Sequence, residues 1–385
     1  MLASVDPLAM PIASYIVSGQ QADDRLYIPA IDQARQSLKQ QAILYVGDTK
    51  LGNQTNFAYL AGSQNWYLCP LSLRQFSEEQ LTQAINVALA NKQSIQMVQQ
   101  NDQAIAQLYE LPSVWLSDEE QSLTWSHRRI LVKSIDLAKT ATESLHKRLK
   151  KAQQQILERF IPKQGRSIFT HLDQAQAFID SVLKRYKVKE VLQAQLQLVP
   201  DLKRNRKLVY CQLKVDQSKL QQHVEQHGWR VYATNCSKQQ LSPEQIVIIY
   251  RQEYRIEQNF HQLLNKVTKL MPIFMSIQSR IQGLIRLLLL ALKFVVIIQY
   301  KVRKALKATQ AFLTGLVPGN PGRKVDQPTT TLLLRAFRPI KLFIFQLPPG
   351  SKQYQIDPLN NIQLKILELL KFDPKIYSHP LMSKN

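Results

Sequence analysis

The chain has 385 residues, 45% of them hydrophobic and 20% charged, which is enough to form one elaborated domain or two to three smaller ones. Its 50 Lys and Arg outnumber its 28 Asp and Glu, giving a formal net charge of +22. That excess is larger than solubility requires, and it points to a polyanionic partner, nucleic acid first and an anionic membrane surface second.

The three cysteines, Cys69, Cys211 and Cys236, stand far apart and lack the spacing of a zinc site. They are typical of free thiols in a reducing cytoplasm. The segment from Met1 to Pro11 has no basic region before an apolar core, so we predict no signal peptide and a cytoplasmic protein.

The first 75 residues alternate between strand and helix patterns. A strand is predicted over Ala13 to Val17, and a helix begins at Asp23 and runs to Leu38. The apolar run from Ala42 to Val46 predicts a strand buried on both faces, and Trp66 to Leu71 predicts another after a helix around Tyr59. This alternation favours an α/β layer.

Asp48 follows the predicted strand that ends at Val46. Ligands of open α/β sheets gather at the carboxyl ends of such strands, which makes Asp48 a candidate site residue. An Asp in this position is as often a turn or cap residue, and the sequence leaves both interpretations open.

From residue 76 to 216 the pattern becomes mainly helical and basic. The predicted helices cover Glu78 to Leu89, Gln100 to Leu108, Ser126 to Ile161 and Asp173 to Tyr186. The long third helix carries most of the cations, among them Arg128, Arg129, Lys147, Arg148, Lys150 and Lys151. A charge run is commonly a solvated face, but several runs on one basic chain favour contact with phosphates.

After residue 207 the predicted elements are strands followed by an apolar helical region. Leu208 to Val215 predicts a strand, with Gly228 to Thr234 as its partner in a sheet. Ser242 and Pro243 begin a helix. Leu284 to Ile298 is too short and too interrupted by charge to span a membrane, so we predict a central helix of a soluble core.

Glu257 lies beside an apolar stripe at helical spacing, with Tyr250, Arg251 and Arg255 close by. A single Glu on an amphipathic helix is usually solvated. The stripe consists of Ile256, Phe260, Leu263, Leu264 and Val267.

Several motifs, in order along the chain, resemble bacterial insertion-sequence transposases of the DDE type, whose Glu lies in a Tyr-x2-Arg-x3-Glu-x6-Lys pattern. Tyr250 and Glu257 match this pattern, whereas Glu253 and Leu264 replace its Arg and Lys. The other matching stretches are Val17-Ser18-Gly19 with Ala22-Asp23-Asp24, Tyr45-Val46-Gly47-Asp48-Thr49-Lys50, and Gly228-Trp229-Arg230-Val231-Tyr232-Ala233-Thr234-Asn235.

The resemblance implies an α/β fold with an RNase H-like core, incomplete at its N-terminus and interrupted by a mainly helical basic insertion. The implied domains are residues 1–75 with Asp48, the insertion 76–216, the remainder of the core 217–312 with Glu257, and a C-terminal extension 313–385. Asp48 and Glu257 would be catalytic carboxylates and ligands of two Mg²⁺ or Mn²⁺ ions, which prefer oxygen donors. The family's first catalytic Asp has no counterpart.

The same resemblance implies double-stranded DNA as partner, both transposon ends and target. Arg251, Arg255 or Lys266 would bind the phosphate that the apolar side chain of Leu264 cannot bind. Tyr250 would either stack on the DNA end or close its helix against the sheet. The basic side chains of the insertion would also bind the DNA backbone, through Arg128, Arg129, Lys147, Arg148, Lys150 and Lys151.

The function implied is metal-dependent DNA end cleavage and strand transfer in DNA transposition, impaired by the missing Asp. The alternative is a non-catalytic DNA-binding remnant that inhibits or pairs with a full-length copy, or forms a homodimer. A membrane partner is not expected.

Overall fold

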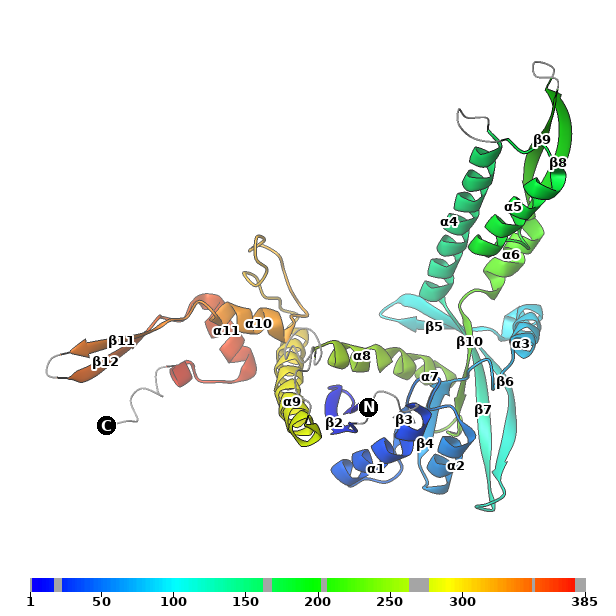
Figure 1. Cartoon of the computed structure of the whole chain (residues 1–385). Coiled ribbons are helices and arrows are strands. Elements are labelled where there is room, and N and C mark those ends of the chain that lie inside the picture. Colours follow the sequence, from blue (N-terminus) through cyan, green and yellow to red (C-terminus); the bar gives the residue numbers. More distant parts are fainter. Residues whose placement is uncertain are drawn as a thin grey trace. The chain divides into compact units, whose positions relative to one another are not determined.

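The computed structural model describes residues 2–16, 23–161, 168–201, 206–262, 277–347 and 350–377. The fold is mixed α/β, as predicted, and the chain forms two compact units (Figure 1). One unit comprises Met1–Gln40 and Glu253–Asn385, and the other, which we call the central unit, comprises Gln41–Gln252. The predicted motif around Val17 to Ala22 lies outside the described residues.

The central unit is built on a sheet with the order β3-β4-β10-β7-β6-β5. Strands β3 and β4 run parallel and are joined by helix α2, whereas all other neighbours are antiparallel. The strands are β3 (Leu44–Val46), β4 (Trp66–Pro70), β5 (Gln96–Gln100), β6 (Gln103–Asp118), β7 (Leu123–Ser134) and β10 (Trp229–Thr234), and α2 spans Gln54–Gly62.

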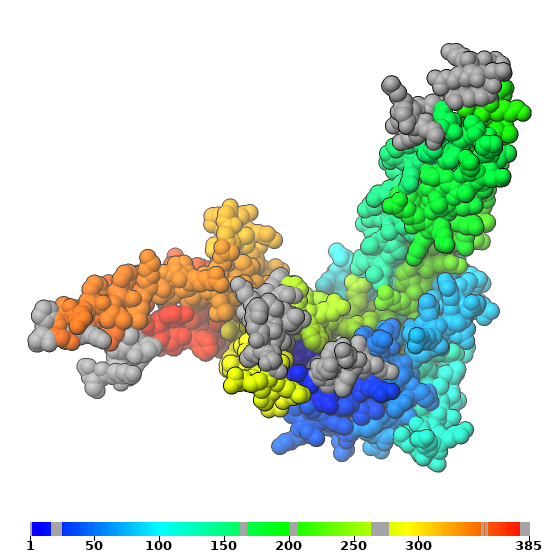
Figure 2. All heavy atoms as spheres, viewed as in Figure 1, coloured from blue at the N-terminus to red at the C-terminus, as the bar shows by residue number. Residues whose placement is uncertain are grey.

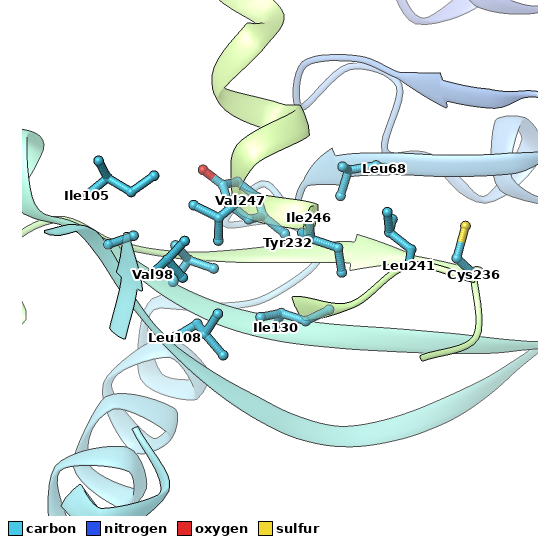
Figure 3. Close-up of a cluster of buried hydrophobic side chains, with 12 residues drawn as sticks. Leu68, Val98, Ile105, Leu108, Ile130, Tyr232, Cys236, Leu241, Ile246 and Val247 are labelled. Carbon is cyan, nitrogen blue, oxygen red and sulfur yellow. The ribbon is translucent and has the colours of Figure 1, made fainter. Parts of the chain in front are cut away.

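Helices cover both faces of this sheet. Ile130 and Val132 of β7 pack with Ile246 of α7 (Pro243–Tyr250) on one face, in the cluster drawn in Figure 3. Leu131, between them in sequence, packs with Ile85 of α3 (Glu78–Ala90) on the other face. This alternation follows from the two-residue period of a strand.

Two of the helices predicted in this unit are wrong in type or extent. Gln100 to Leu108 is not a helix, because residues from Gln103 onward form β6. The predicted helix from Ser126 to Ile161 begins only at Ile135, since the preceding residues belong to β7. The region 76–216 therefore holds long strands beside its helices and is not mainly helical.

The segment after β7 forms a second core within the central unit. Helix α4 (Ile135–Phe160) packs against α5 (Leu172–Tyr186) through Leu149, Ile156 and Ile179, all buried. A hairpin of β8 (Leu192–Asp201) and β9 (Arg206–Val215) completes this core, and α6 (Gln217–Gln226) leads back to the sheet. The predicted pairing of Leu208–Val215 with Gly228–Thr234 is wrong, because β9 pairs with β8 whereas β10 lies between β4 and β7.

The other unit begins with a hairpin of β1 (Leu2–Val5) and β2 (Met10–Ser14). Leu2 packs with Leu289, Leu292 and Val296 of α9 (Gln278–Ala308). Its further elements are η1 (Asp23–Leu26), α1 (Tyr27–Leu38), η3 (Arg251–Glu253, which joins the two units), α8 (Tyr254–His261), α10 (Thr330–Phe337), β11 (Leu342–Leu347), β12 (Ser351–Ile356), α11 (Asn361–Leu370) and η5 (Pro374–Tyr377).

Helix α9 is, among the described residues, the one helix long and apolar enough to cross a membrane, judged by length and composition. Such a helix is weak evidence for a span, and the structure is compatible with a soluble protein. We predicted that Leu284 to Ile298 is a central core helix, but only 22% of its most apolar window is buried. Val295 and Val302 are buried, whereas Leu287 and Phe294 are exposed.

Candidate nucleic-acid interface

Asp48 lies directly after β3, at the edge of the sheet and at the carboxyl end of a parallel strand, where it was predicted. The side chain is exposed, and its Oδ1 accepts a hydrogen bond from the backbone N–H of Lys50 at 2.8 Å. The carbonyl oxygen of Asp48 accepts another from the N–H of Leu51 at 3.1 Å. Asp48 therefore shapes the turn that follows β3.

Glu257 is exposed on α8, in the unit that does not contain Asp48. This helix is fixed to the β1–β2 hairpin by Asn259, whose buried amide donates to the Ala9 carbonyl oxygen at 2.6 Å. Arg255 adds a hydrogen bond to the Pro7 carbonyl oxygen at 3.1 Å and an ion pair with Asp6 at 3.4 Å. Residues two apart lie on opposite sides of a helix, so Glu257 faces away from the hairpin that Arg255 and Asn259 contact.

The predicted metal ligands do not form a metal centre within either unit. No group of three or more His, Cys, Asp or Glu side chains among the described residues is placed to hold a metal ion. Of the two predicted ligands, Asp48 belongs to the central unit and Glu257 to the other unit. Within each unit the described residues supply no such group of ligands, and we derive no metal-dependent step.

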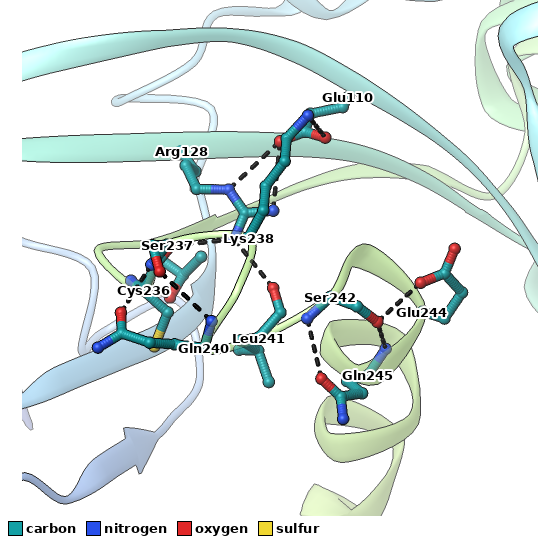
Figure 4. A network of polar contacts seen from close by, with 11 residues as sticks. Glu110, Arg128, Cys236, Ser237, Lys238, Gln240, Leu241, Ser242, Glu244 and Gln245 are labelled. Atoms are coloured by element: carbon teal, nitrogen blue, oxygen red, sulfur yellow. Dashed lines mark hydrogen bonds and ion pairs between the residues drawn. The ribbon is translucent and has the colours of Figure 1, made fainter.

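Arg128 was predicted to contact DNA, but its side chain is buried in the central unit. Its guanidinium donates to Glu110 Oε1 from Nε and from a terminal nitrogen, at 3.3 and 3.2 Å. The other terminal nitrogen donates to the carbonyl oxygens of Cys236 and Leu241 at 2.9 and 3.0 Å, as Figure 4 shows. Arg128 is 4% exposed and holds the loop before α7 against the sheet, so it is not available to DNA.

Three more predicted arginines have partners inside the protein. Arg148 of α4 donates to the carbonyl oxygen of Tyr186 at 3.0 Å, where it caps the last turn of α5. Arg129 donates to the Pro112 carbonyl oxygen at 3.0 Å, and burial lowers its pKa. Arg251 pairs with Asp136 at 3.2 Å. These contacts give each arginine a role within the fold.

The ring of Tyr250 packs against that of Tyr232, with 4.6 Å between the centroids. Tyr250 also borders the core cluster beneath α7. Of its two predicted roles, the structure shows the packing of the helix against the sheet. Lys266 lies outside the described residues.

The predicted DNA contacts that remain are Lys147, Lys150 and Lys151, and all three are exposed on α4. Lys147 is three and four residues from the other two, so their ammonium groups lie on adjacent parts of one helix face. Lys139, also exposed, lies eleven residues before Lys150 and shares its side of the helix. The buried side chains of α4, including Leu149 and Ala152, lie on the opposite side of the helix and keep this basic face directed to solvent. Figure 2 shows all atoms of this part of the chain as spheres.

A buried group of aromatic side chains from β4 and β7 was not predicted. The indole N–H of Trp125 donates to the Tyr67 hydroxyl at 3.0 Å, and that hydroxyl lies 2.7 Å from Nδ1 of His127. Because an indole nitrogen only donates, the Tyr67 hydroxyl is the acceptor in its contact with Trp125. Burial and, secondarily, Arg129 lower the pKa of His127 to about 4. The three side chains are buried, so this group contributes to the stability of the fold and is not a site open to solvent.

No family model matches the chain, and no curated protein matches it either.

Proposed function

We propose that this chain is a protein that binds double-stranded DNA, of the insertion-sequence transposase type, and that it acts in the bacterial cytoplasm. The observation that carries the proposal is the exposed face of Lys147, Lys150 and Lys151 on α4, in a chain with a net charge of +22. The order of the motifs around Asp48, Gly228 and Glu257 supports the relation to transposases. In this proposal the central unit and the α8 helix derive from an RNase H-like core.

Lysines on such a face suit contact with the DNA backbone. Each ammonium group that neutralises a phosphate releases a condensed counterion, which gives affinity that does not depend on sequence. Lysine also presents its charge as a mobile point with three donors, so the face can follow a phosphate row without fixed geometry. The arginines with partners inside the protein leave this part of the interface to lysine.

We propose DNA binding without cleavage as the function of this chain because the exposed lysine face of α4 supports contact with DNA that needs no chemical step. DNA ends and target DNA are the proposed partners, together with a second copy or a full-length transposase. The chain would then occupy ends or join a mixed dimer. Asp48 at the carboxyl end of β3 favours the second candidate, DNA end cleavage, since ligands of open α/β sheets bind at that end of the strands.

The test of DNA binding is fluorescence anisotropy of the full chain with a 30-bp duplex of random sequence over a range of salt concentrations. Replacing Lys147, Lys150 and Lys151 by Gln removes three charges and is expected to lower the slope of log affinity against log salt by about 2.7. The matched control replaces Lys92, Lys307 and Lys341, also exposed, by Gln and keeps the net charge of the two variants equal. Salt-independent binding by the wild type, or equal slopes in the two variants, would overturn the proposal.

A nicking assay with Mg²⁺ and supercoiled plasmid separates the two candidates. The full chain is expected to leave the plasmid intact while it lowers transposition by a complete transposase in a mixing experiment. Nicking that disappears in the Asp48→Asn and Glu257→Gln variants, with DNA affinity unchanged, would establish cleavage in place of binding alone.

A further inference from the structure

The β8–β9 hairpin, which we call the ribbon, has one covered and one open face. Cys211 and Leu213 point toward α4 and α5, where they join the buried cluster around Ile156 and Ile179, and Val209, of the same parity, is also buried. The even-numbered residues of β9 from Leu208 to Lys214 point away from the helices, as do the odd-numbered residues of β8 from Gln193 to Val199, and these outward positions are exposed or half-exposed. The ribbon is thus a two-stranded element held from behind by helices, with its other face in solvent (Figure 1).

The open face carries side chains that hydrogen-bond in both directions. Cross-strand pairs on it are Gln193 with Lys214, Gln195 with Gln212, Gln197 with Tyr210 and Val199 with Leu208. A carboxylate is absent from these eight positions. Gln193 is engaged with Asp216, its amide nitrogen 3.4 Å from the carboxylate, whereas Gln195, Gln197 and Gln212 are exposed. Tyr210 is 57% exposed.

We propose that the open face of the ribbon enters the major groove of double-stranded DNA and reads base edges with Gln195, Gln197 and Gln212. This inference rests on the proposed function and names the part of the chain that gives it sequence preference. A glutamine amide offers one donor and one acceptor side, which matches N6 and N7 of adenine. Lys214 and the Tyr210 hydroxyl, at the borders of the glutamine set, are placed to contact phosphates.

The dimensions of the ribbon agree with this role. Two strands lie about 4.8 Å apart, and the B-DNA major groove, about 12 Å wide, admits a two-stranded β-ribbon. A duplex of A-form RNA has a major groove too narrow for such an element, so the geometry selects DNA. The charge agrees as well, because Lys214 is exposed on this face and none of its eight paired positions, 193, 195, 197, 199, 208, 210, 212 and 214, carries a carboxylate.

The ribbon and α4 are expected to make different kinds of contact with DNA, because their exposed residues differ in type. Lysines at 147, 150 and 151 supply contacts that every sequence can make, whereas the glutamines of the ribbon distinguish one base pair from another. Removing the glutamines should therefore change preference with little effect on binding to random DNA. Removing the lysines should do the reverse.

The experiment is a selection from a pool of duplexes with a randomised 20-bp centre, performed with the full chain. The test variant replaces Gln195, Gln197 and Gln212 by Ala, and the control replaces Gln83, Gln174 and Gln222, which are exposed on α3, α5 and α6. The wild type and the control are expected to enrich the same A·T-containing motif. The test variant is expected to lose roughly tenfold or more of the preference for that motif over random DNA.

The affinity of each variant for random DNA is measured beside the selection, with circular dichroism to show that each is folded. Enrichment of the same motif by the folded test variant would overturn the inference and leave DNA binding in place, as would tighter binding of a matched RNA duplex. Failure of the wild type to bind DNA at all would overturn the proposed function itself, so the two failures are distinguishable. If the triple variant does not fold, single Ala variants of the three glutamines are tested in its place. The inference is overturned if each of these single variants keeps the preference of the wild type.

Discussion

Gly228 approaches Ala138 so closely that a Cβ atom on Gly228 would lie 2.8 Å from the Cβ atom of Ala138. The same added atom would be 2.8 Å from the Ser134 carbonyl oxygen and from the Ala138 backbone nitrogen. Gly228 also has a φ of +83°, which side chains disfavour. This contact joins the entry of β10 to the point where β7 becomes α4.

Gly228→Ala is therefore expected to destabilise the protein by more than backbone strain alone, by roughly 3 kcal/mol against about 1 kcal/mol for strain. The control is Gly319→Ala, because Gly319 has a φ of +75° and no atom within 4 Å of an added Cβ. Urea unfolding of both variants measures the difference. Equal destabilisation of the two variants would mean that the backbone and side chain of Ala138 move aside with no loss in the free energy of unfolding.

Arg128→Met is expected to lower the free energy of unfolding by roughly 3 kcal/mol, since it leaves Glu110 and two carbonyl oxygens without their buried donor. Lys238 also pairs with Glu110, at 2.8 Å, and limits the effect. Lys238→Met, which removes an exposed partner, should cost far less. The salt slope of DNA binding by folded Arg128→Met should match the wild type, and a reduced slope would return Arg128 to the DNA interface.

The lowered pKa of His127 leads us to expect that the protein loses stability in mild acid. This pKa is about 4 in the folded protein and about 6.5 when unfolded, so the unfolded chain binds the extra proton between these values. The stabilisation is complete above pH 6.5 and falls as the pH drops toward 4, by roughly 3 kcal/mol. Chemical unfolding between pH 4 and 7 measures it. His127→Gln should show a shallower dependence on pH in that window, and an unchanged slope would assign the effect to other groups.

Asn259→Ala is expected to loosen α8 from the β1–β2 hairpin. The change removes donors to Ala9 and Ser4 and leaves the Ala9 carbonyl oxygen without its side-chain partner, at a cost of about 1–3 kcal/mol. Gln258→Ala is the matched control because Gln258 is exposed on the same helix. Hydrogen exchange of the α8 amides reports the change, and protection equal to that of the control would show that other contacts fix the helix.

The sequence was sufficient to predict α1, α3, α5 and the strand–helix–strand unit around Asp48, because their apolar periods are regular, and the starts of α3 and α7 coincide with explicit caps. Ser77 and Ser242, for example, both form capping boxes. Strand β8 was not among the predicted elements, although Leu192 to Leu198 alternates strictly between glutamine and an apolar side chain, a two-residue period.

Strand β6 was harder to recognise, for a physical reason. Its pairing with β5 shifts register between Val98 and Gln99, and an extra residue at Ile105 places Ile105 and Leu108 in the same cluster. That bulge turns a two-residue period into a spacing of three, which imitates a helix. The boundary between β7 and α4 was also hidden, since Ser134 ends the strand and caps the helix at once.

The candidate site shows the same limit. A sequence displays which residues are basic but not which of them form hydrogen bonds within the fold. Arg128 and Arg148 both donate to backbone carbonyl oxygens of the protein. Among the predicted contacts, the lysines of α4 stayed at the surface because the opposite helix face carries the apolar side chains. That separation is visible in the helical spacing of Leu145, Leu149 and Ile156.

In the proposed DNA interface, the length of α4 sets a scale for the duplex that the central unit would cover. With 26 residues the helix measures about 39 Å, and one turn of B-DNA measures about 34–36 Å. Its first turn adjoins β7 and its second half adjoins the ribbon, so the distance between these two places is close to one turn of B-DNA. In the proposed interface, a duplex lying along α4 would therefore present the same groove, on the same side, to both ends of the helix.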